Sequence, residues 1–478
     1  MQEKFSFTPL RRVYGMVMLP ACVLMVIAAG TVVAQEQTLE PVSYHKQIWP
    51  IIQRSCQGCH QPAESNGDLI MVTFEDFKRG GLDGTPFIPG KPDESLVMEL
   101  ISGDEPTMPK EGDLLTDKEV ELFRRWIAEG AKNDTPIMDD DAINPNQPPV
   151  YRVPLVISAL AYSPDGKTLA VSGFREVLLH KSDGSELVGR LVGKSHRIQS
   201  IVYTADGKML GAVGGSPGKF GEVQLWDTST NTLIKSIKTS YDTVYGASFS
   251  PDGKQIAFGC ADNTARIISI ADAKEILKFE NHSDWVFGTL FSTDGTHFVT
   301  AGRDSALKLV EIKSGSFIDD INASNKGYGG INVIVRHPQR DEVLSAGDDH
   351  VPRLYRIFRQ TRRDVGNTDF NLIRAFERQP GTVQAADFSA DGMKMAVGST
   401  GGSVRVYNVA DGKQLAAFIG DGVAVFALAF HPDGKQVATA GFDGKVRIFD
   451  VDSGETVKVF MPVPLPSEQL ALAVLGMT

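Results

Sequence analysis

The chain has 478 residues and a formal net charge of −11, and 42% of its residues are hydrophobic and 8% aromatic. This length exceeds one ordinary hydrophobic core, so two or three domains are expected, and the composition excludes wholesale disorder. The acidic balance argues against nucleic-acid binding, because proteins that bind nucleic acid normally carry a basic stripe. Acidic residues exceed basic ones mainly in the segment 36–135, where selection of a partner by charge is therefore expected.

Residues 1–34 have the features of an export signal. The segment begins with the basic residues Lys4, Arg11 and Arg12. A mostly apolar run follows and ends in a small-residue cleavage site at Ala34. This pattern predicts an exported bacterial protein of the periplasm or cell envelope. The alternative is an uncleaved anchor that associates with the membrane, because the apolar run is nearly long enough to span one.

Residues 56–60 read Cys-Gln-Gly-Cys-His, and no other segment of the chain indicates so specific a chemistry. Two thiols three residues apart can each add to a vinyl group of one haem, and the next histidine is then placed under the iron. We therefore predict one covalent haem c, attached through Cys56 and Cys59. His60 is the predicted proximal axial ligand of the iron.

Three other interpretations of the motif are weaker. A thioredoxin-like redox pair would lie in a βαβ context, which the sequence lacks here. A structural zinc site would need about two more Cys or His ligands at short spacing. A plain disulfide would leave His60 without a role. The remaining cysteines are Cys22 in the export signal and Cys260, which reads as a small buried residue.

A helix is expected before the motif and another at the end of the same region. Ser43 can cap the first helix, and Pro50 must either kink this helix or start its main segment. The second helix begins with a capping box formed by Thr116 and Glu119 and stops at Gly130. A glycine- and proline-rich loop lies between the two helices.

Met108 lies on the proline-flanked loop 106–109 and is the candidate for the sixth iron ligand. A thioether on a stiff loop can be held against the iron, where it raises the potential relative to a second histidine. The alternative is a loop methionine that packs on apolar neighbours. Met71 and Met98 are rivals, but each lies in a strand- or helix-like run that favours the core. His45 precedes the motif by one helix and is badly placed for the distal side.

The run from Tyr44 to Asn133 resembles the cytochrome c domain common in planctomycetes and related environmental bacteria. The matching stretches are Ile48-x-Pro50-Ile51, the CxxCH motif, Pro89-Gly90-Lys91-Pro92-x-Glu94-Ser95-Leu96, Met108-Pro109 and Arg125-Trp126-Ile127-x-x-Gly130-Ala131. The resemblance implies an all-α cytochrome c domain over residues 41–135, with covalent haem c, His60 proximal and Met108 distal. Lys110 replaces the family's second proline after the ligand methionine, which would loosen this loop.

A turn motif recurs seven times in the rest of the chain, at intervals of 41 to 52 residues. Its copies begin at Ser163, Thr204, Ser250, Ser292, His337, Ser389 and His431. Each copy joins two alternating strands, and four short strands per unit at this period predict a seven-bladed, all-β propeller over residues 150–462. The units resemble WD40 repeats, although only Trp226-Asp227 keeps the name-giving dipeptide. Residues 136–149 form an acidic, proline-containing linker, and residues 463–478 form a tail.

Two groups of side chains in the propeller bear on its function. The seven histidines fall at unrelated places in the repeat, which argues against a converging metal site. Arginines gather around an insertion at about 359–370. They predict either a solvated loop or a basic docking face, for which the acidic front domain itself is a candidate partner. These arginines are Arg353, Arg356, Arg359, Arg362, Arg363, Arg374 and Arg378.

These patterns together predict an exported monohaem c-type cytochrome that transfers one electron at a time. The propeller is expected to dock a partner protein, and the sequence does not identify the redox partners. No nucleophile, phosphate loop or carboxylate pair stands out, which favours a carrier over an enzyme. One alternative is a periplasmic oxidoreductase subunit whose propeller binds a substrate or second cofactor. Another is a haem-based sensor that signals through a weak Met108 bond.

Overall fold

The computed structural model of the protein describes residues 40–61, 64–135, 143–323, 327–361, 371–419 and 422–466. The predicted export signal, the insertion arginines Arg362 and Arg363, and the end of the tail from residue 467 lie outside these ranges. Among the helices within them, none is long and apolar enough to cross a membrane. Export and membrane anchoring therefore stay predictions.

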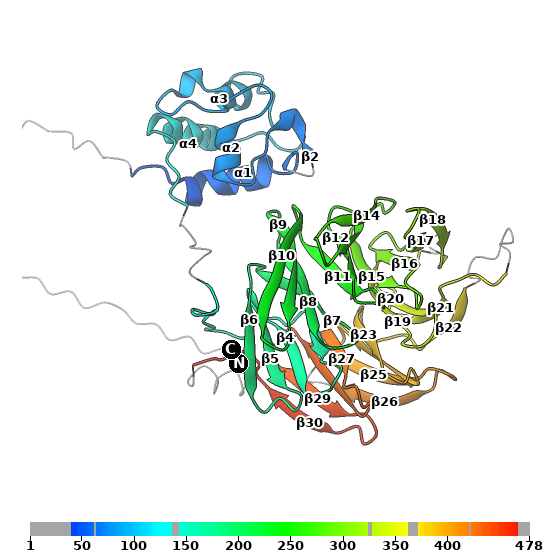
Figure 1. Cartoon of the computed structure of the whole chain (residues 1–478). Helices are drawn as coiled ribbons and strands as arrows, with labels where there is room; N and C mark the ends of the chain where they lie inside the picture. The colour runs from blue at the N-terminus through cyan, green and yellow to red at the C-terminus, as the bar shows by residue number, and fades with distance from the viewer. Residues whose placement is uncertain are drawn as a thin grey trace, which may run out of the picture. The chain divides into compact units, whose positions relative to one another are not determined.

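The front region, residues 42–135, is a small, mainly helical unit (Figure 1). Its helices are η1 (Tyr44–Ile48), α1 (Trp49–Ser55), η2 (Asn66–Asp68), α2 (Phe74–Arg79), η3 (Pro92–Glu94), α3 (Leu96–Ile101) and α4 (Asp117–Ala128). The all-α expectation is met only in part, because the chain doubles back after the CxxCH motif. There β1 (His60–Gln61) pairs antiparallel with β2 (Glu64–Ser65). Most of the helices are also short, and long loops join them.

The two predicted helix starts are confirmed in their local geometry. The Ser43 side chain accepts a hydrogen bond from the Lys46 amide, and Pro50 lies in the first turn of α1, where its missing N–H costs nothing. At α4, the Thr116 hydroxyl accepts from the Glu119 amide, and the Glu119 carboxylate accepts from the Thr116 amide at 2.9 Å. Local side-chain chemistry therefore determines where both helices start.

One apolar core holds the front region together, and Trp126 of α4 lies at its centre with 1% of its surface exposed. Rings that contact Trp126 come from every part of the region: Tyr44, Phe74, Phe77, Phe87 and Phe123. The indole Nε1 donates to the Lys132 carbonyl at 3.0 Å, so the polar group of this buried side chain is satisfied. Helices this short cannot persist alone, and this shared burial keeps them folded.

The rest of the chain confirms the seven-bladed propeller (Figure 1): each blade is a four-stranded antiparallel sheet of consecutive strands. Blades 1 and 2 contain β3 (Leu160–Tyr162), β4 (Thr168–Ser172), β5 (Glu176–Lys181), β6 (Leu187–Val192), β7 (Arg197–Tyr203), β8 (Met209–Ser216), β9 (Phe220–Asp227) and β10 (Thr232–Ser240). Blades 3 and 4 contain β11 (Val244–Phe249), β12 (Gln255–Cys260), β13 (Ala265–Ser269), β14 (Glu275–Phe279), β15 (Val286–Phe291), β16 (His297–Gly302), β17 (Leu307–Glu311) and β18 (Phe317–Asp320).

The remaining three blades follow in the same order along the chain. Blade 5 contains β19 (Ile331–Arg336), β20 (Glu342–Gly347), β21 (Arg353–Arg356) and β22 (Leu372–Ala375). Blades 6 and 7 contain β23 (Val383–Phe388), β24 (Lys394–Ser399), β25 (Ser403–Asn408), β26 (Gln414–Ile419), β27 (Val425–Phe430), β28 (Gln436–Gly441), β29 (Val446–Asp450) and β30 (Thr456–Phe460).

The repeated turn motif works through the same side-chain contacts in most blades, as blade 1 illustrates. The Ser163 hydroxyl donates to Asp165 at 2.7 Å, and Asp165 accepts from the Lys167 amide at 3.1 Å. These bonds hold the pKa of Asp165 below its ordinary value. Gly166 supplies the positive φ of 69° that the turn needs. This turn chemistry is local, which is why the repeat could be recognised in the sequence.

Blade 1 and blade 7 meet without exchanging a strand, and segments beyond both blades seal the seam between them. The Ile157 amide donates to the Gly441 carbonyl at 3.0 Å, and the His180 ring pairs with the Pro462 carbonyl at 3.0 Å. Val463 is 4% exposed and packs in the apolar cluster of this seam. The packed part of the propeller therefore includes Val463, the first residue of the expected tail.

A buried polar knot fixes the end of the linker to blade 1. The Tyr151 hydroxyl donates to Glu176 of β5 at 2.5 Å. Arg190 of β6 donates to both oxygens of Glu176, at 2.7 and 2.6 Å, and to the Pro149 carbonyl at 2.7 Å. The Glu176 side chain is fully buried, and Arg190 balances its charge at 2.6 Å.

Candidate functional site

The CxxCH motif forms a tight turn directly at the end of α1. The Cys56 amide closes the last turn of the helix on the Ile52 carbonyl at 2.9 Å. The amides of Cys59 and His60 then both donate to the Cys56 carbonyl, at 3.3 and 3.1 Å. The first cysteine therefore begins the turn, and the second cysteine and the histidine end it.

Two hydrogen bonds to Met71, one from backbone and one from a side chain, hold this turn against the rest of the front region. The Met71 amide donates to the His60 carbonyl at 2.8 Å, and the Gln57 side chain donates to the Met71 carbonyl at 2.8 Å. Met71 itself is 4% exposed and belongs to the core. Sequence reasoning missed the role of Gln57, because its partner is fourteen residues away and no local pattern marks it.

Both motif cysteines are half-buried and free, so the plain-disulfide interpretation has no support. Burial raises the pKa of Cys56 to about 11, and the nearby Arg54 only partly offsets this. A redox-active thiolate needs the opposite shift, which weighs against the thioredoxin-like interpretation. In the part of the chain that the structure describes, no three His, Cys, Asp or Glu side chains gather as metal ligands. The zinc interpretation therefore lacks its additional ligands.

One nitrogen of the His60 ring makes no hydrogen bond to the protein. Its Nδ1 is buried and has no hydrogen-bond partner, although buried ring nitrogens are normally paired. A histidine whose Nδ1 is not bonded to the protein, beside two free thiols, fits the residue types of a haem-binding motif, in which the imidazole serves as an iron ligand. The donor set of the turn therefore fits the predicted group.

The predicted distal ligand lies at the same core as the motif. Met108 is partly buried and packs against the apolar core that Cys56 also contacts. Its loop is fixed to the last turn of α3, because the amides of Thr107 and Met108 both donate to the Leu100 carbonyl, at 2.9 and 3.0 Å. Met98 is 2% exposed and, like Met71, is a member of the core.

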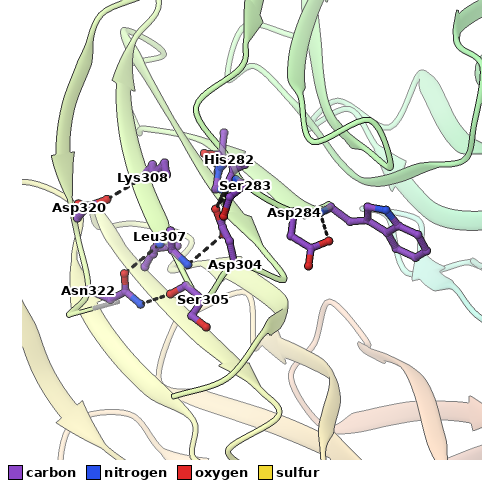
Figure 2. Close-up of polar contacts among 12 residues, drawn as sticks. His282, Ser283, Asp284, Asp304, Ser305, Leu307, Lys308, Asp320 and Asn322 are labelled. Atoms are coloured by element: carbon purple, nitrogen blue, oxygen red, sulfur yellow. Dashed lines mark hydrogen bonds and ion pairs between the residues drawn. The ribbon is translucent and has the colours of Figure 1, made fainter. Parts of the chain in front are cut away.

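Polar side chains of the propeller are largely used within its blades, as the network of blade 4 shows (Figure 2). His282 pairs with Asp304 at 2.9 Å. It also pairs with Thr300 at 2.7 Å. Asn322 accepts from the Leu307 amide at 3.0 Å and donates to the Ser305 carbonyl at 2.8 Å. Three other blades use an Asp–Arg pair four residues apart instead: Asp262–Arg266, Asp349–Arg353 and Asp443–Arg447. These groups stabilise the scaffold.

The described arginines around the insertion are mostly engaged inside the propeller. Arg359 pairs with Asp319, and Arg353 pairs with Asp349 at 2.6 Å. Arg374 donates to two backbone carbonyls of the neighbouring blade, at 2.8 and 3.0 Å. The structure therefore gives these three arginines structural partners, which weakens the hypothesis of a basic docking face.

The inner strands of the blades surround a central channel of about 780 Å³. Aromatic side chains such as Tyr245 and Phe287 and the amides of Asn332 and Gln384 line it. Asp387 also lines the channel and accepts from the Phe430 amide of the next blade at 2.8 Å. Burial raises the pKa of Asp387 to about 6.

Fold and motif together define a protein in which a CxxCH-bearing helical region is joined to a seven-bladed propeller of WD-repeat type. Residues 56–112 match the family "Planctomycete cytochrome C", so the resemblance seen in the sequence is confirmed. Residues 194–470 match the family "Nucleolar protein 10-like, N-terminal domain". Because this second match spans more than half of the chain, the protein belongs to that β-propeller family.

Curated relatives are similar over smaller parts. WD repeat-containing protein 1 of Rattus norvegicus is 26% identical over 169 residues, which is 34% of this chain and 26% of the relative. The Arabidopsis thaliana guanine nucleotide-binding protein subunit beta is 22% identical over 239 residues, 48% of this chain and 60% of the relative. The human intraflagellar transport protein 122 homolog is 36% identical over 89 residues, 19% of this chain and 7% of the relative. The chain spans about a quarter of the length of the first of these relatives.

Proposed function

We propose that the protein is an exported monohaem c-type cytochrome that carries single electrons. The observation that carries this proposal is the turn at the end of α1, where two free cysteines precede a histidine whose ring nitrogen has no partner. The family match over the same residues supports it. Bound haem would supply one-electron chemistry at its iron.

The residues of the front region have distinct roles in this proposal. Cys56 and Cys59 form the two thioether bonds, and His60 is the proximal ligand. Met71 fixes the turn through one backbone bond to the His60 carbonyl and one bond from the Gln57 side chain. Met108 is the distal ligand, and the attachment of its loop to Leu100 limits how far the thioether can move. We propose that residues 41–135 form a cytochrome c domain despite the short β1–β2 pair.

We further propose that the protein works in the periplasm or cell envelope, because residues 1–34 have the pattern of an export signal. The propeller is proposed to dock a redox partner protein. Its polar groups are used inside the blades, which makes it a rigid scaffold, and the plant relative is named as a subunit of a guanine nucleotide-binding protein. Partner docking through a related propeller is an inference from that similarity.

Covalent haem attachment is tested by expressing the full chain with a cytochrome-maturation system. Denatured protein should retain haem on a gel, and the Cys56→Ser/Cys59→Ser variant should lose it. Cys260→Ser is the matched control, because Cys260 is buried in the propeller and should not affect haem. Haem retained by the double variant would contradict the proposal.

The distal ligand is tested by near-infrared spectroscopy of the ferric protein, which should show the weak sulfur-to-iron charge-transfer band. Met108→Leu keeps the side-chain volume and should abolish the band. Met71→Leu and Met98→Leu are controls in the same core and should keep it. If one of these two variants loses the band and Met108→Leu keeps it, the distal ligand is a different methionine.

A second candidate function is an oxidoreductase subunit whose propeller holds a small molecule. The channel of about 780 Å³ favours it, since ligand pockets usually measure roughly 300 to 1,000 Å³. Absorbance and native mass spectrometry of the purified protein distinguish the candidates, because a second chromophore or bound mass supports the enzyme. A sensor would instead bind carbon monoxide readily at the iron, where a six-coordinate carrier would not.

A further inference from the structure

One position in the wall of the central channel departs from the pattern of the repeat. The innermost strand of each blade ends with the residue directly before the turn motif, and in six blades this residue is a tyrosine or a phenylalanine. In blade 5 it is Arg336, the last residue of β19. The register confirms that the positions are equivalent, because all seven residues pair with an apolar residue of the second strand. The six aromatic residues are Tyr162, Tyr203, Phe249, Phe291, Phe388 and Phe430.

These seven residues lie at the same end of the channel. The inner strands of neighbouring blades lie against each other around the whole ring. The turns that follow these strands also contact each other, since the His337 ring pairs with the Gly392 carbonyl at 3.2 Å and the His431 ring with the Gly166 carbonyl at 3.0 Å. Arg336 and five of the six aromatic residues line the channel here. The channel therefore ends in a mainly aromatic wall that contains a cation.

The guanidinium group of Arg336 pairs with no carboxylate among the residues that the structure describes. It donates one hydrogen bond, from Nη1 to the His337 carbonyl at 3.2 Å, although it carries five N–H donors. Both oxygens of the nearby Asp341 carboxylate accept from Thr293, at 2.7 and 2.8 Å. Burial lowers the pKa of Arg336 from its ordinary value, and Asp341 offsets this only in part. A half-buried cation without a bonded counter-ion is costly, and a bound anion would remove this cost.

The other charged residue among those described in the channel wall is Asp387, and its carboxylate is already used. It accepts from the Phe388 amide at 2.9 Å and from the Phe430 amide at 2.8 Å. Asp387 therefore joins blade 6 to blade 7 and does not balance Arg336. This end of the channel thus offers a cation and apolar rings to a molecule that has a negative group on an apolar body.

We propose that this end of the central channel binds a small aromatic carboxylate, to which Arg336 donates hydrogen bonds while the aromatic wall packs against its ring. A guanidinium group matches a carboxylate through two parallel hydrogen bonds. One cation balances one negative charge, which favours a carboxylate over a doubly charged phosphate. The channel of about 780 Å³ has room for such a molecule. This inference rests on that part of the second candidate function in which the channel holds a small molecule, and it does not depend on haem.

The test measures binding of benzoate to the full chain by saturation-transfer NMR, with benzyl alcohol as a neutral probe that has the same ring. Benzoate should bind at least about tenfold more tightly than benzyl alcohol, because a hydrogen bond to a charged group contributes this much. Arg336→Phe introduces the residue type of the other blades and should therefore fold, and it should reduce benzoate binding to the level of benzyl alcohol. Arg340→Ala is the control, since Arg340 is exposed, pairs with Glu342 at 3.1 Å and is not part of the channel wall.

Benzoate binding that is absent, equal to that of benzyl alcohol or unchanged in Arg336→Phe would overturn the proposal. An equal loss of binding in Arg340→Ala would also overturn it, because the effect would then come from the general charge of this surface. If calorimetry shows that Arg336→Phe has lost the propeller transition, Arg336→Gln takes its place, since an amide can still donate to the His337 carbonyl. The same loss of benzoate binding is then expected, and retained binding contradicts the proposal. Absence of covalent haem from the unmodified chain would overturn the cytochrome proposal and leave this one standing.

Discussion

The front region and the propeller treat their buried polar groups differently. In the propeller, the buried carboxylate of Glu176 is balanced by Arg190, and that of Glu222 accepts from Ser195, Gln224 and Ser236. In the front region, the Tyr44 hydroxyl and a His60 ring nitrogen are buried without a partner. Unpartnered buried atoms also occur in the propeller, for example the Ser248 hydroxyl, so the front region differs in that one of its unpartnered atoms belongs to the histidine of the CxxCH motif.

The largest effect is expected for Arg190→Ala in the propeller knot. This change leaves the fully buried Glu176 carboxylate without its cation, and breaking such a pair costs about 3–5 kcal/mol. Calorimetry of the full chain should show the propeller transition at a lower temperature and the front region unchanged. Arg124→Ala is the control: its pair with Asp93 is exposed and should contribute at most about 1 kcal/mol. If the two variants lowered the stability equally, the buried Glu176 carboxylate would not depend on Arg190 for its stabilisation.

A smaller effect concerns pH and Asp387. Its pKa is raised from 3.8 to about 6 in the folded protein, so the folded state binds this proton more tightly than the unfolded state. The resulting stability is fully present below about pH 4 and is lost as pH rises to about 6, by up to about 3 kcal/mol. Denaturant unfolding at pH 4 to 7 should show this slope in the unmodified chain and lose it in Asp387→Asn. If the unmodified chain and Asp387→Asn showed the same dependence of stability on pH, the Asp387 carboxyl would not be desolvated in the folded protein.

The smallest effect tests the front region alone. Thr116→Ala removes the capping hydroxyl of α4 and should destabilise the front region by about 1 kcal/mol. The propeller transition should not move. Thr85→Ala is the control, since Thr85 is exposed and a surface change of this kind stays within about 0.5 kcal/mol. A shift of both transitions by Thr116→Ala would mean that the two regions unfold together.

Features encoded within a few residues could be predicted from the sequence. The capping box of Thr116 and Glu119 and the turn from Ser163 to Gly166 depend on neighbours three or four residues apart. The seven blades follow because the same turn recurs. The CxxCH motif is equally local, and the structure adds that its cysteines are free and that the buried Nδ1 of its histidine has no hydrogen-bond partner.

Contacts between distant residues could not be predicted in this way. The pair of Arg359 with Asp319 joins residues forty positions apart, so the arginine looked like surface charge in the sequence. The burial of Val463 depends on blade 1, at the opposite end of the propeller sequence. The unpartnered Tyr44 hydroxyl is invisible to any pattern, because a tyrosine and a phenylalanine fit the same apolar periodicity.

The knot of Tyr151, Glu176 and Arg190 has a mechanical consequence. Tension on the chain ahead of Pro149 reaches Arg190 on β6 and Glu176 on β5 before it can reach β3, the innermost strand of blade 1. The paired strands β5 and β6 then carry the load together through the hydrogen bonds between them. Strand β3 is not pulled off the sheet by itself. Tension that arrives at Pro149 is therefore shared by the outer strands of blade 1 and does not first load the seam with blade 7.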